Sequence, residues 1–224
     1  MDWEKPAATT QQLARAEGLE PRLRGKGLPF SRMTGAALLQ ASGAGIVHAA
    51  TPFTLKASDE LLWMQRLLRR ADAVGAAGEI PVAAVVLDAE GRAIGWGSNR
   101  RERDQQPLGH AELVALQQAA KLRNDWRFND CTLIVTLEPC PMCAGALVQA
   151  RLGRVIYGAA DPKRGGLGGV LDLSRCRSAH HHMQVSAGLM DQACSAQLEG
   201  WFRRRRQQRR EQRSGKPVTP APAS

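Results

Sequence analysis

The chain has 224 residues, a hydrophobic fraction of 43% and a formal net charge of +10. Its length and apolar content fit one globular domain with extensions, and no apolar run approaches the roughly 20 residues of a membrane-spanning helix. Five cysteines in a chain of this length do not indicate a disulfide framework; Cys131, Cys176 and Cys194 are expected to be packing residues. We therefore expect a cytoplasmic protein without a membrane partner.

The basic excess is concentrated at the two ends of the chain. Residues 1–57 carry seven basic and four acidic side chains, residues 58–202 carry sixteen of each, and residues 203–224 carry eight basic and one acidic. A basic tail on a neutral domain attracts polyanions at long range in a salt-dependent way, which favours RNA as a partner. The alternative for the arginine run at 203–206 is a solvated helix face.

Composition divides the chain into three segments. Residues 1–57 are rich in Ala, Gly, Thr and Pro without a sustained period, which predicts a disordered extension, and a start codon assigned too far upstream would look the same. Residues 58–206 show the periodic patterns of a folded domain. Residues 207–224 form a tail that is first basic and then rich in proline.

The first half of the predicted domain contains a helix and a hairpin. Ser58 precedes two acidic residues and an apolar helical repeat, so it is expected to cap a helix that ends near Gly75. Apolar runs at 81–87 and 93–97 flank the turn sequence Asp-Ala-Glu-Gly, which predicts a β-hairpin. A polar loop is expected at 100–106.

In the second half, strands and helices follow one another. Strands are expected at 132–137, 154–159 and 183–185. Helices are expected to begin at His110, Cys140 and Met190, the last of them reaching about Arg213. A hairpin followed by such alternation predicts an α/β domain with three α/β/α layers and a mixed five-stranded sheet.

Two short motifs have the spacing of a metal centre. His110 and Glu112 share the first turn of one predicted helix, whereas Cys140 and Cys143 lie on one face of the next. One imidazole and two thiolates supply three ligands of tetrahedral zinc and leave the fourth position for water. Glu112 is then a suitable acid/base for hydrolytic attack on a ring carbon. A closed structural zinc would need a fourth protein ligand, and no nearby His or Cys is placed to provide it.

The segment from about Ser58 to Arg206 resembles the bacterial tRNA-specific adenosine deaminases, which have the cytidine-deaminase-like fold. The motifs that carry the resemblance are Glu-Ile-Pro-Val at 79–82, Ser-Asn-Arg at 98–100, Gly-His-Ala-Glu-Leu at 109–113, Thr-Leu-Glu-Pro-Cys-Pro-Met-Cys-Ala-Gly-Ala at 136–146 and Tyr-Gly-Ala-Ala-Asp-Pro-Lys at 157–163. The resemblance implies one Zn²⁺ per subunit, bound by His110, Cys140 and Cys143, with Glu112 moving protons. It also implies substrate contacts; the residues concerned are Asn99, the backbone N–H of Ala111, Asp161 and Lys163.

The function implied by the resemblance is hydrolytic deamination of adenosine to inosine in a tRNA anticodon loop, at the wobble position. The implied partners are the tRNA anticodon stem-loop and a second subunit in a homodimer. Two alternatives stay open: a deaminase of a free base or nucleoside of the guanine or cytosine type, and a non-catalytic RNA-binding module with structural zinc. Glu112 argues against the second, because a structural site does not require it. The tract His180–His182 is expected to be a polar connector, with metal or RNA binding as its alternatives.

Overall fold

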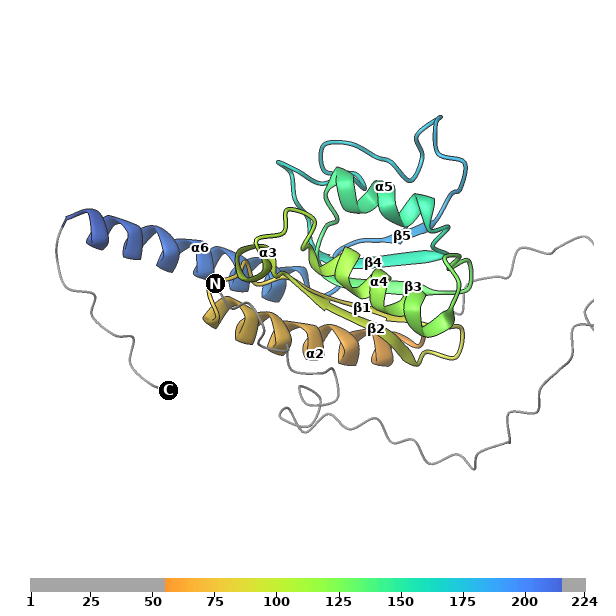
Figure 1. Ribbon diagram of the computed structural model, residues 1–224, viewed down its shortest axis with the longest axis horizontal. Helices are drawn as coiled ribbons and strands as arrows, with labels where there is room; N and C mark the ends of the chain where they lie inside the picture. Colours follow the sequence, from red (N-terminus) through yellow and green to blue (C-terminus); the bar gives the residue numbers. More distant parts are fainter. Residues whose placement is uncertain (1–54, 215–224) are drawn as a thin grey trace, which may run out of the picture. The chain divides into compact units, whose positions relative to one another are not determined.

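The computed structural model describes residues 55–214 and shows a five-stranded sheet between two layers of helices (Figure 1). The helices are α2 (Ala57–Ala76), α3 (Arg101–Asp104), α4 (Ala111–Arg123), α5 (Pro141–Gln149) and α6 (Asp191–Arg213). The strands are β1 (Ala83–Leu87), β2 (Ala93–Ser98), β3 (Thr132–Leu137), β4 (Arg154–Ala159) and β5 (Gln184–Ser186). The predicted fold class, α/β with a mixed five-stranded sheet, is confirmed.

The strand order is β2-β1-β3-β4-β5. β1 is antiparallel to both of its neighbours, whereas β3, β4 and β5 run parallel to one another. The register pairs Leu137 at the end of β3 with Ala159 at the end of β4. The segments that leave these two strands therefore emerge side by side at the carboxyl edge of the sheet, the usual place for ligand sites in such folds.

The central strands β1, β3 and β4 are buried on both faces, and their successive side chains point alternately into two cores. One core, with Ala84, Val86, Leu133 and Val135, includes side chains of α4 and α5. The other core, with Val85, Ile134 and Ile156, includes side chains of α2 and α6. Figure 1 shows the same division, with α4 and α5 on one side of the sheet and α2 and α6 on the other.

Helix α4 lies unusually close to the edge strand β2. A Cβ atom on Gly97 would overlap the backbone carbonyl oxygen of Ala111, so only glycine allows this approach. Near the middle of the strand, the backbone N–H of Trp96 donates to Oε1 of Gln118 from α4 at 2.6 Å. These contacts therefore fix the position of the N-terminus of α4 relative to β2. This end of the helix carries the first half of the metal motif.

Three local predictions differ from the structure. Helix α2 begins at Ala57 after the N-cap residue Lys56, so Ser58 lies inside the first turn and does not cap it. The predicted loop at 100–106 contains the single-turn helix α3, where Oε1 of buried Glu79 accepts the N–H of Arg103 at 2.8 Å. Leu55 is also buried in the second core, so the folded part begins before Ser58. The prediction for residues 1–54 lies outside the described residues.

Helix α6 begins after Met190 and continues to Arg213, as predicted. It is attached to α2 through the Trp201 indole, whose Nε1–H donates to the carbonyl oxygen of Gly75 at 3.0 Å. The C-terminal part of α6 extends past the sheet (Figure 1), and most of the side chains after Trp201 are exposed. Among residues 55–214 no helix is long and apolar enough to cross a membrane.

Candidate metal centre

The N-termini of two helices bring the metal motif together. His110 is the N-cap residue of α4, Cys140 is the N-cap residue of α5, and Cys143 lies in the first turn of α5. His110 Nδ1 is 3.7 Å from Cys140 Sγ and 3.5 Å from Cys143 Sγ. Within the described part of the chain, this is the one group of three metal-ligating side chains that converges, with all ligand atoms within 4.8 Å of one another.

These distances fit tetrahedral zinc. With ordinary bonds of about 2.0 Å to nitrogen and about 2.3 Å to sulfur, the nitrogen–sulfur edge of a zinc tetrahedron is about 3.5 Å. One observed edge has this length and the other is slightly longer. The triad therefore has both the donor atoms and the spacing for zinc, with Nδ1 as the histidine ligand.

The two thiols differ in how readily they ionise. A hydrogen bond with Cys143 is the largest influence on Cys140 and, together with His110, lowers its pKa to about 4. The same bond raises the pKa of Cys143, because its proton is shared with the Cys140 thiolate. A bound metal ion would displace this remaining proton, since the ligand form of cysteine is the thiolate.

Glu112 lies beside the triad in the first turn of α4 and is 4% exposed. Burial raises the pKa of this carboxyl, because desolvation disfavours the ionised form. A carboxyl that is not held permanently ionised can both accept and return a proton, as a general acid/base must. Its carboxyl interacts with His110 and Cys143, so it lies next to the candidate metal ligands.

Asn99 and Ala111, both predicted substrate contacts, are in direct contact with each other. Asn99 follows β2, is buried, and accepts the backbone N–H of Ala111 through Oδ1 at 3.1 Å. This bond ties the start of α4 to the end of β2. Because the Ala111 hydrogen points at Asn99 in this arrangement, the expected contact of Ala111 with substrate stays a prediction.

Asp161 and Lys163 lie in the segment that follows β4. The carboxylate of Asp161 accepts the backbone N–H groups of Lys163 and Arg164, each at 3.0 Å, so it closes a turn. The side chains of Lys163 and Arg164 are exposed. The structure thus presents two cations from a rigid turn, whereas the Asp161 carboxylate is engaged within the chain.

Sequence reasoning used Glu138, which immediately precedes the Pro-Cys motif, only as part of the resemblance to tRNA deaminases and predicted no structural partner for it. This carboxyl is 2% exposed and accepts three backbone N–H groups from the segment 161–169. The only signals in the sequence were the acidic residue at the end of a strand and the paired glycines at 165–166 and 168–169. Neither the acidic residue nor the glycines indicate that the two segments contact each other.

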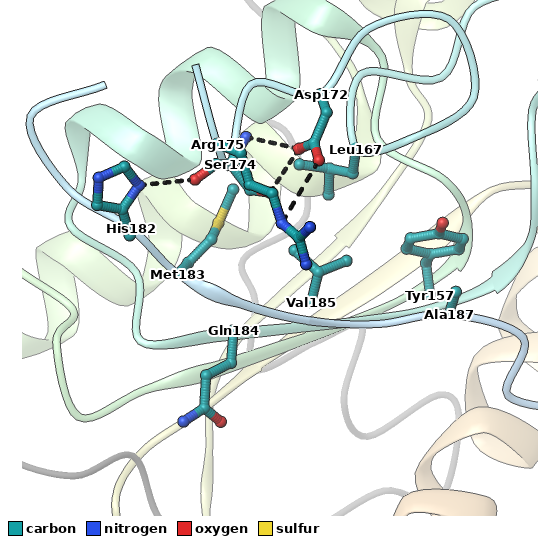
Figure 2. A pocket seen from close by; sticks show the side chains of 10 residues that line it. All are labelled: Tyr157, Leu167, Asp172, Ser174, Arg175, His182, Met183, Gln184, Val185 and Ala187. Carbon is teal, nitrogen blue, oxygen red and sulfur yellow. Dashed lines mark hydrogen bonds and ion pairs between the residues drawn. The ribbon is translucent and has the colours of Figure 1, made fainter. Parts of the chain in front are cut away.

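The histidine tract belongs to a different part of the molecule. His181 Nε2 pairs with the carbonyl oxygen of Leu152 at 2.7 Å, and His182 Nδ1 pairs with that of Ser174 at 2.9 Å. These contacts fit the predicted polar connector before β5. His182 also lines a hollow of about 540 Å³ shown in Figure 2, together with Tyr157, Leu167, Asp172 and Arg175; its lining contains no residue of the metal triad.

Comparison with known proteins decides the family. Residues 58–204 match the MafB19-like deaminase family. The chain is 36% identical over 149 residues to a tRNA-specific adenosine deaminase of Bacillus subtilis, a match that covers 66% of this chain and 92% of that relative.

The chain belongs to the tRNA-specific adenosine deaminase family. Among solved structures, it is similar to one from a study of A-to-I editing by tRNA:A34 deaminases at the wobble position of transfer RNA. The TM-score is 0.59 and the identity 32%, and the match covers 61% of this chain and 98% of that chain. The cytidine-deaminase-like fold implied by the sequence motifs is therefore confirmed.

A guanine deaminase from Nitrosomonas europaea shares the fold of this deaminase family. The two structures match with a TM-score of 0.54 and 24% identity, and the match covers 68% of this chain and 88% of that chain. At this level of identity the similarity concerns architecture alone. It does not favour a free base as the substrate.

Proposed function

We propose that this chain is a zinc-dependent hydrolase that deaminates adenosine to inosine in a tRNA anticodon loop, at the wobble position. The observation that carries the proposal is the convergence of His110, Cys140 and Cys143 beside the buried carboxyl of Glu112. The relatives of this family are named for the same substrate. The site supports this function more specifically than the fold does, since the fold alone serves several deaminases.

His110, Cys140 and Cys143 are the residues that would hold the metal. Zinc bound by them would supply Lewis acidity that lowers the pKa of a water molecule toward neutrality. The burial of Glu112 keeps its carboxyl next to this position and away from bulk solvent. The protein's part in the reaction is then to move protons and to orient the base.

Glu112 performs the proton transfers in this proposal. As water adds to C6 of the adenine ring, Glu112 accepts a proton from the water and passes it to N1 of the base. The remaining hydroxyl proton then moves through Glu112 to the amino group at C6. The C6–N bond breaks, ammonia leaves, and the ring carries the carbonyl of inosine. Atoms and charges balance without any other reactant.

Residues around the triad are suited to hold the nucleoside. Oδ1 of Asn99 is engaged by Ala111, so the Nδ2 amide is the end available to donate to a substrate. The exposed cations Lys163 and Arg164 are placed to meet phosphates next to the target. The base must leave the stack to reach Glu112, which costs least in an unpaired loop and favours an anticodon loop over a duplex.

The basic end of α6 is the second proposed contact with tRNA. Residues 203–213 carry seven arginines and one glutamate, and nearly all of them are exposed. Attraction of these cations to phosphates is independent of sequence and sensitive to salt. It concentrates the RNA near the domain, while the residues around the metal triad select the base.

Two further features complete the proposal. We infer a homodimer, as the resemblance implies, and reaction in the cytoplasm, where tRNA would be available. Equilibrium sedimentation of the purified chain tests the first point: a mass near twice 24.3 kDa is expected. A mass of one chain at micromolar concentration would contradict it.

The substrate class is tested by offering the protein an anticodon stem-loop with adenosine at the wobble position, free adenosine and free guanine. Inosine should form in the stem-loop, with a kcat/KM at least about 100-fold above that for either free compound, because the RNA contributes binding energy remote from the reacting carbon. A matched stem-loop with guanosine at the same position is the control. Conversion of free guanine with no change in the stem-loop would contradict the proposal.

A further inference from the structure

Glu138 joins the metal-binding segment to the segment that carries the exposed cations. It lies between Leu137, the last residue of β3, and the Pro139-Cys140 pair. Its Oε2 accepts the N–H of Asp161 at 2.8 Å, and its Oε1 accepts those of Leu167 at 3.0 Å and Gly169 at 2.9 Å. We call residues 161–169 the recognition loop. Three of its backbone donors are thus held by one buried carboxylate.

The recognition loop is in direct contact with the metal-binding turn. The N–H of Gly166 donates to the carbonyl oxygen of Pro139 at 2.8 Å. A Cβ atom on Gly166 would lie 2.9 Å from Cα of Pro141 and 3.0 Å from the carbonyl carbon of Cys140. The loop therefore has almost no freedom to move toward the zinc ligands, and Glu138 keeps it from moving away.

Gly165 is shaped to receive the Glu138 carboxyl. A Cβ atom at residue 165 would overlap all three atoms of that carboxyl group. A side chain there would push the carboxylate off its three donors or displace the loop. Gly165 and Glu138 therefore form one structural unit, in which the glycine leaves room for the carboxyl group, although 27 positions separate them in the sequence.

We propose that Glu138 is a positioning residue that holds the recognition loop against the metal-binding turn, and thereby sets the affinity for RNA and not the rate of the chemical step. The link to RNA rests on the proposed function. The placement of the loop rests on the contacts alone. In the proposed reaction Glu138 does not contact the reacting atoms and takes no part in the proton transfers.

The pattern of donors makes a carboxylate necessary. An ionised carboxylate offers acceptor sites on both oxygens, and here all three partners are donors. In Glu138→Gln one end keeps a carbonyl oxygen for Leu167 and Gly169, while the other presents an NH₂ group to the N–H of Asp161. Two donors then face each other, and the Asp161 end of the loop is released.

Hydrogen exchange in the zinc-loaded protein tests the placement of the loop independently of activity. In Glu138→Gln the amide of Asp161 should exchange at least about tenfold faster than in the wild type, with smaller changes at Leu167 and Gly169. In Glu138→Ala all three amides should exchange faster, whereas amides within β3 should not change. Unchanged protection at Asp161, Leu167 and Gly169 in both variants would overturn the proposal.

Steady-state kinetics on the stem-loop separate positioning from chemistry. We expect Glu138→Gln to raise KM about tenfold, the effect of one lost charge-assisted hydrogen bond, with kcat within about threefold of wild type. Zinc content should stay the same. A fall in kcat with unchanged KM, or loss of zinc, would assign Glu138 to the metal centre and overturn the proposal.

A double-mutant cycle tests the pairing with Gly165. Gly165→Ala should raise KM much as Glu138→Ala does, and the double variant should be no worse than either single one, because removal of the carboxyl makes room for the new methyl group. Gly145→Ala is the control, since a Cβ there meets nothing within 4 Å, and it should behave as wild type. Simple additivity of the two increases in KM would contradict the proposed pairing of Glu138 with Gly165.

A wrong substrate assignment would give a different set of results from a wrong role for Glu138. If the wild-type protein formed no inosine in any stem-loop, the substrate assignment would fall. The exchange pattern at residues 161, 167 and 169 would still decide whether Glu138 holds the loop.

Discussion

Glu112 shows how one buried side chain gains a chemical role from its surroundings. An exposed glutamate is ionised at neutral pH and can only accept a proton, but burial raises the pKa of Glu112 and brings the neutral form within reach. Its neighbours His110 and Cys143 are proposed metal ligands, so in the proposed reaction Glu112 would take a proton from a position next to the metal. The proposed acid/base role depends on both the burial and the position of this carboxyl.

Replacement of Glu112 by alanine should abolish turnover and preserve the metal. We expect kcat for inosine formation to fall by at least about 100-fold, the usual contribution of a general acid/base, with zinc content and circular dichroism unchanged. Glu90→Ala, which removes an exposed carboxyl from the turn between β1 and β2, is the control. Normal turnover in Glu112→Ala would refute the assigned proton transfers.

Cysteine substitutions should separate ligands from packing residues. In Cys143→Ser the zinc content is expected to fall from about one ion per chain to less than about 0.2, because a hydroxyl is a poor replacement for a thiolate. Cys176→Ser should retain full zinc, since Cys176 contacts Ser178 and lies outside the triad. Metal analysis of the dialysed proteins is the measurement. Equal zinc in the two variants would contradict the ligand set.

At the scale of elements, prediction succeeded where the information is local. Strands β3 and β4 were predicted with their observed bounds, because both are short apolar runs with sharp ends. The metal triad was predictable as well, since helix periodicity places Cys140 and Cys143 on one face and strand order brings α4 and α5 together. Helix α3 was missed because its support is Glu79, a residue outside its own segment.

Glu138 marks the limit of the same reasoning. Its three partners are 23, 29 and 31 residues away in the sequence, and all of them are backbone groups. No side-chain pattern encodes such contacts. They become visible only when the parallel register of β3 and β4 places the two loops side by side.

Helix α6 is the element whose predicted role depends on charge. Truncation after Phe202 keeps Trp201 and its bond to Gly75, so the domain should stay folded while seven arginines of the helix are lost. We expect weaker tRNA binding and a smaller slope of log affinity against log salt, by about 0.9 for each lost phosphate contact. Filter binding measures this slope between roughly 50 and 200 mM salt, the range in which phosphate contacts weaken strongly. An unchanged slope would show that α6 is only a solvated helix.

At the scale of the whole molecule, the folded part begins earlier than composition indicated. Leu55 is 6% exposed and packs in the core under α2, so residues 1–54 and residues 1–57 are not equivalent deletions. We propose separate functions for the neutral domain and the basic end of α6: the domain selects and converts the base, and the helix attracts the RNA.

Deletion of residues 1–54 should leave kcat and KM unchanged, because every residue assigned to the metal centre and to substrate binding lies within residues 55–214. Deletion of residues 1–57 should lower the free energy of unfolding by about 2 kcal/mol through the loss of the buried Leu55 side chain. Urea denaturation of the two truncated proteins measures the difference. A large loss of turnover in the shorter deletion would show that the extension takes part in the reaction.

The central claim is that adenosine deamination depends on one zinc ion held by His110, Cys140 and Cys143. The most direct measurement is metal content against inosine formation as the purified protein is stripped with a chelator and then reloaded with Zn²⁺. We expect activity on the anticodon stem-loop to fall in proportion to the zinc removed and to return at about one equivalent of zinc per chain. Full activity in protein without metal would contradict it.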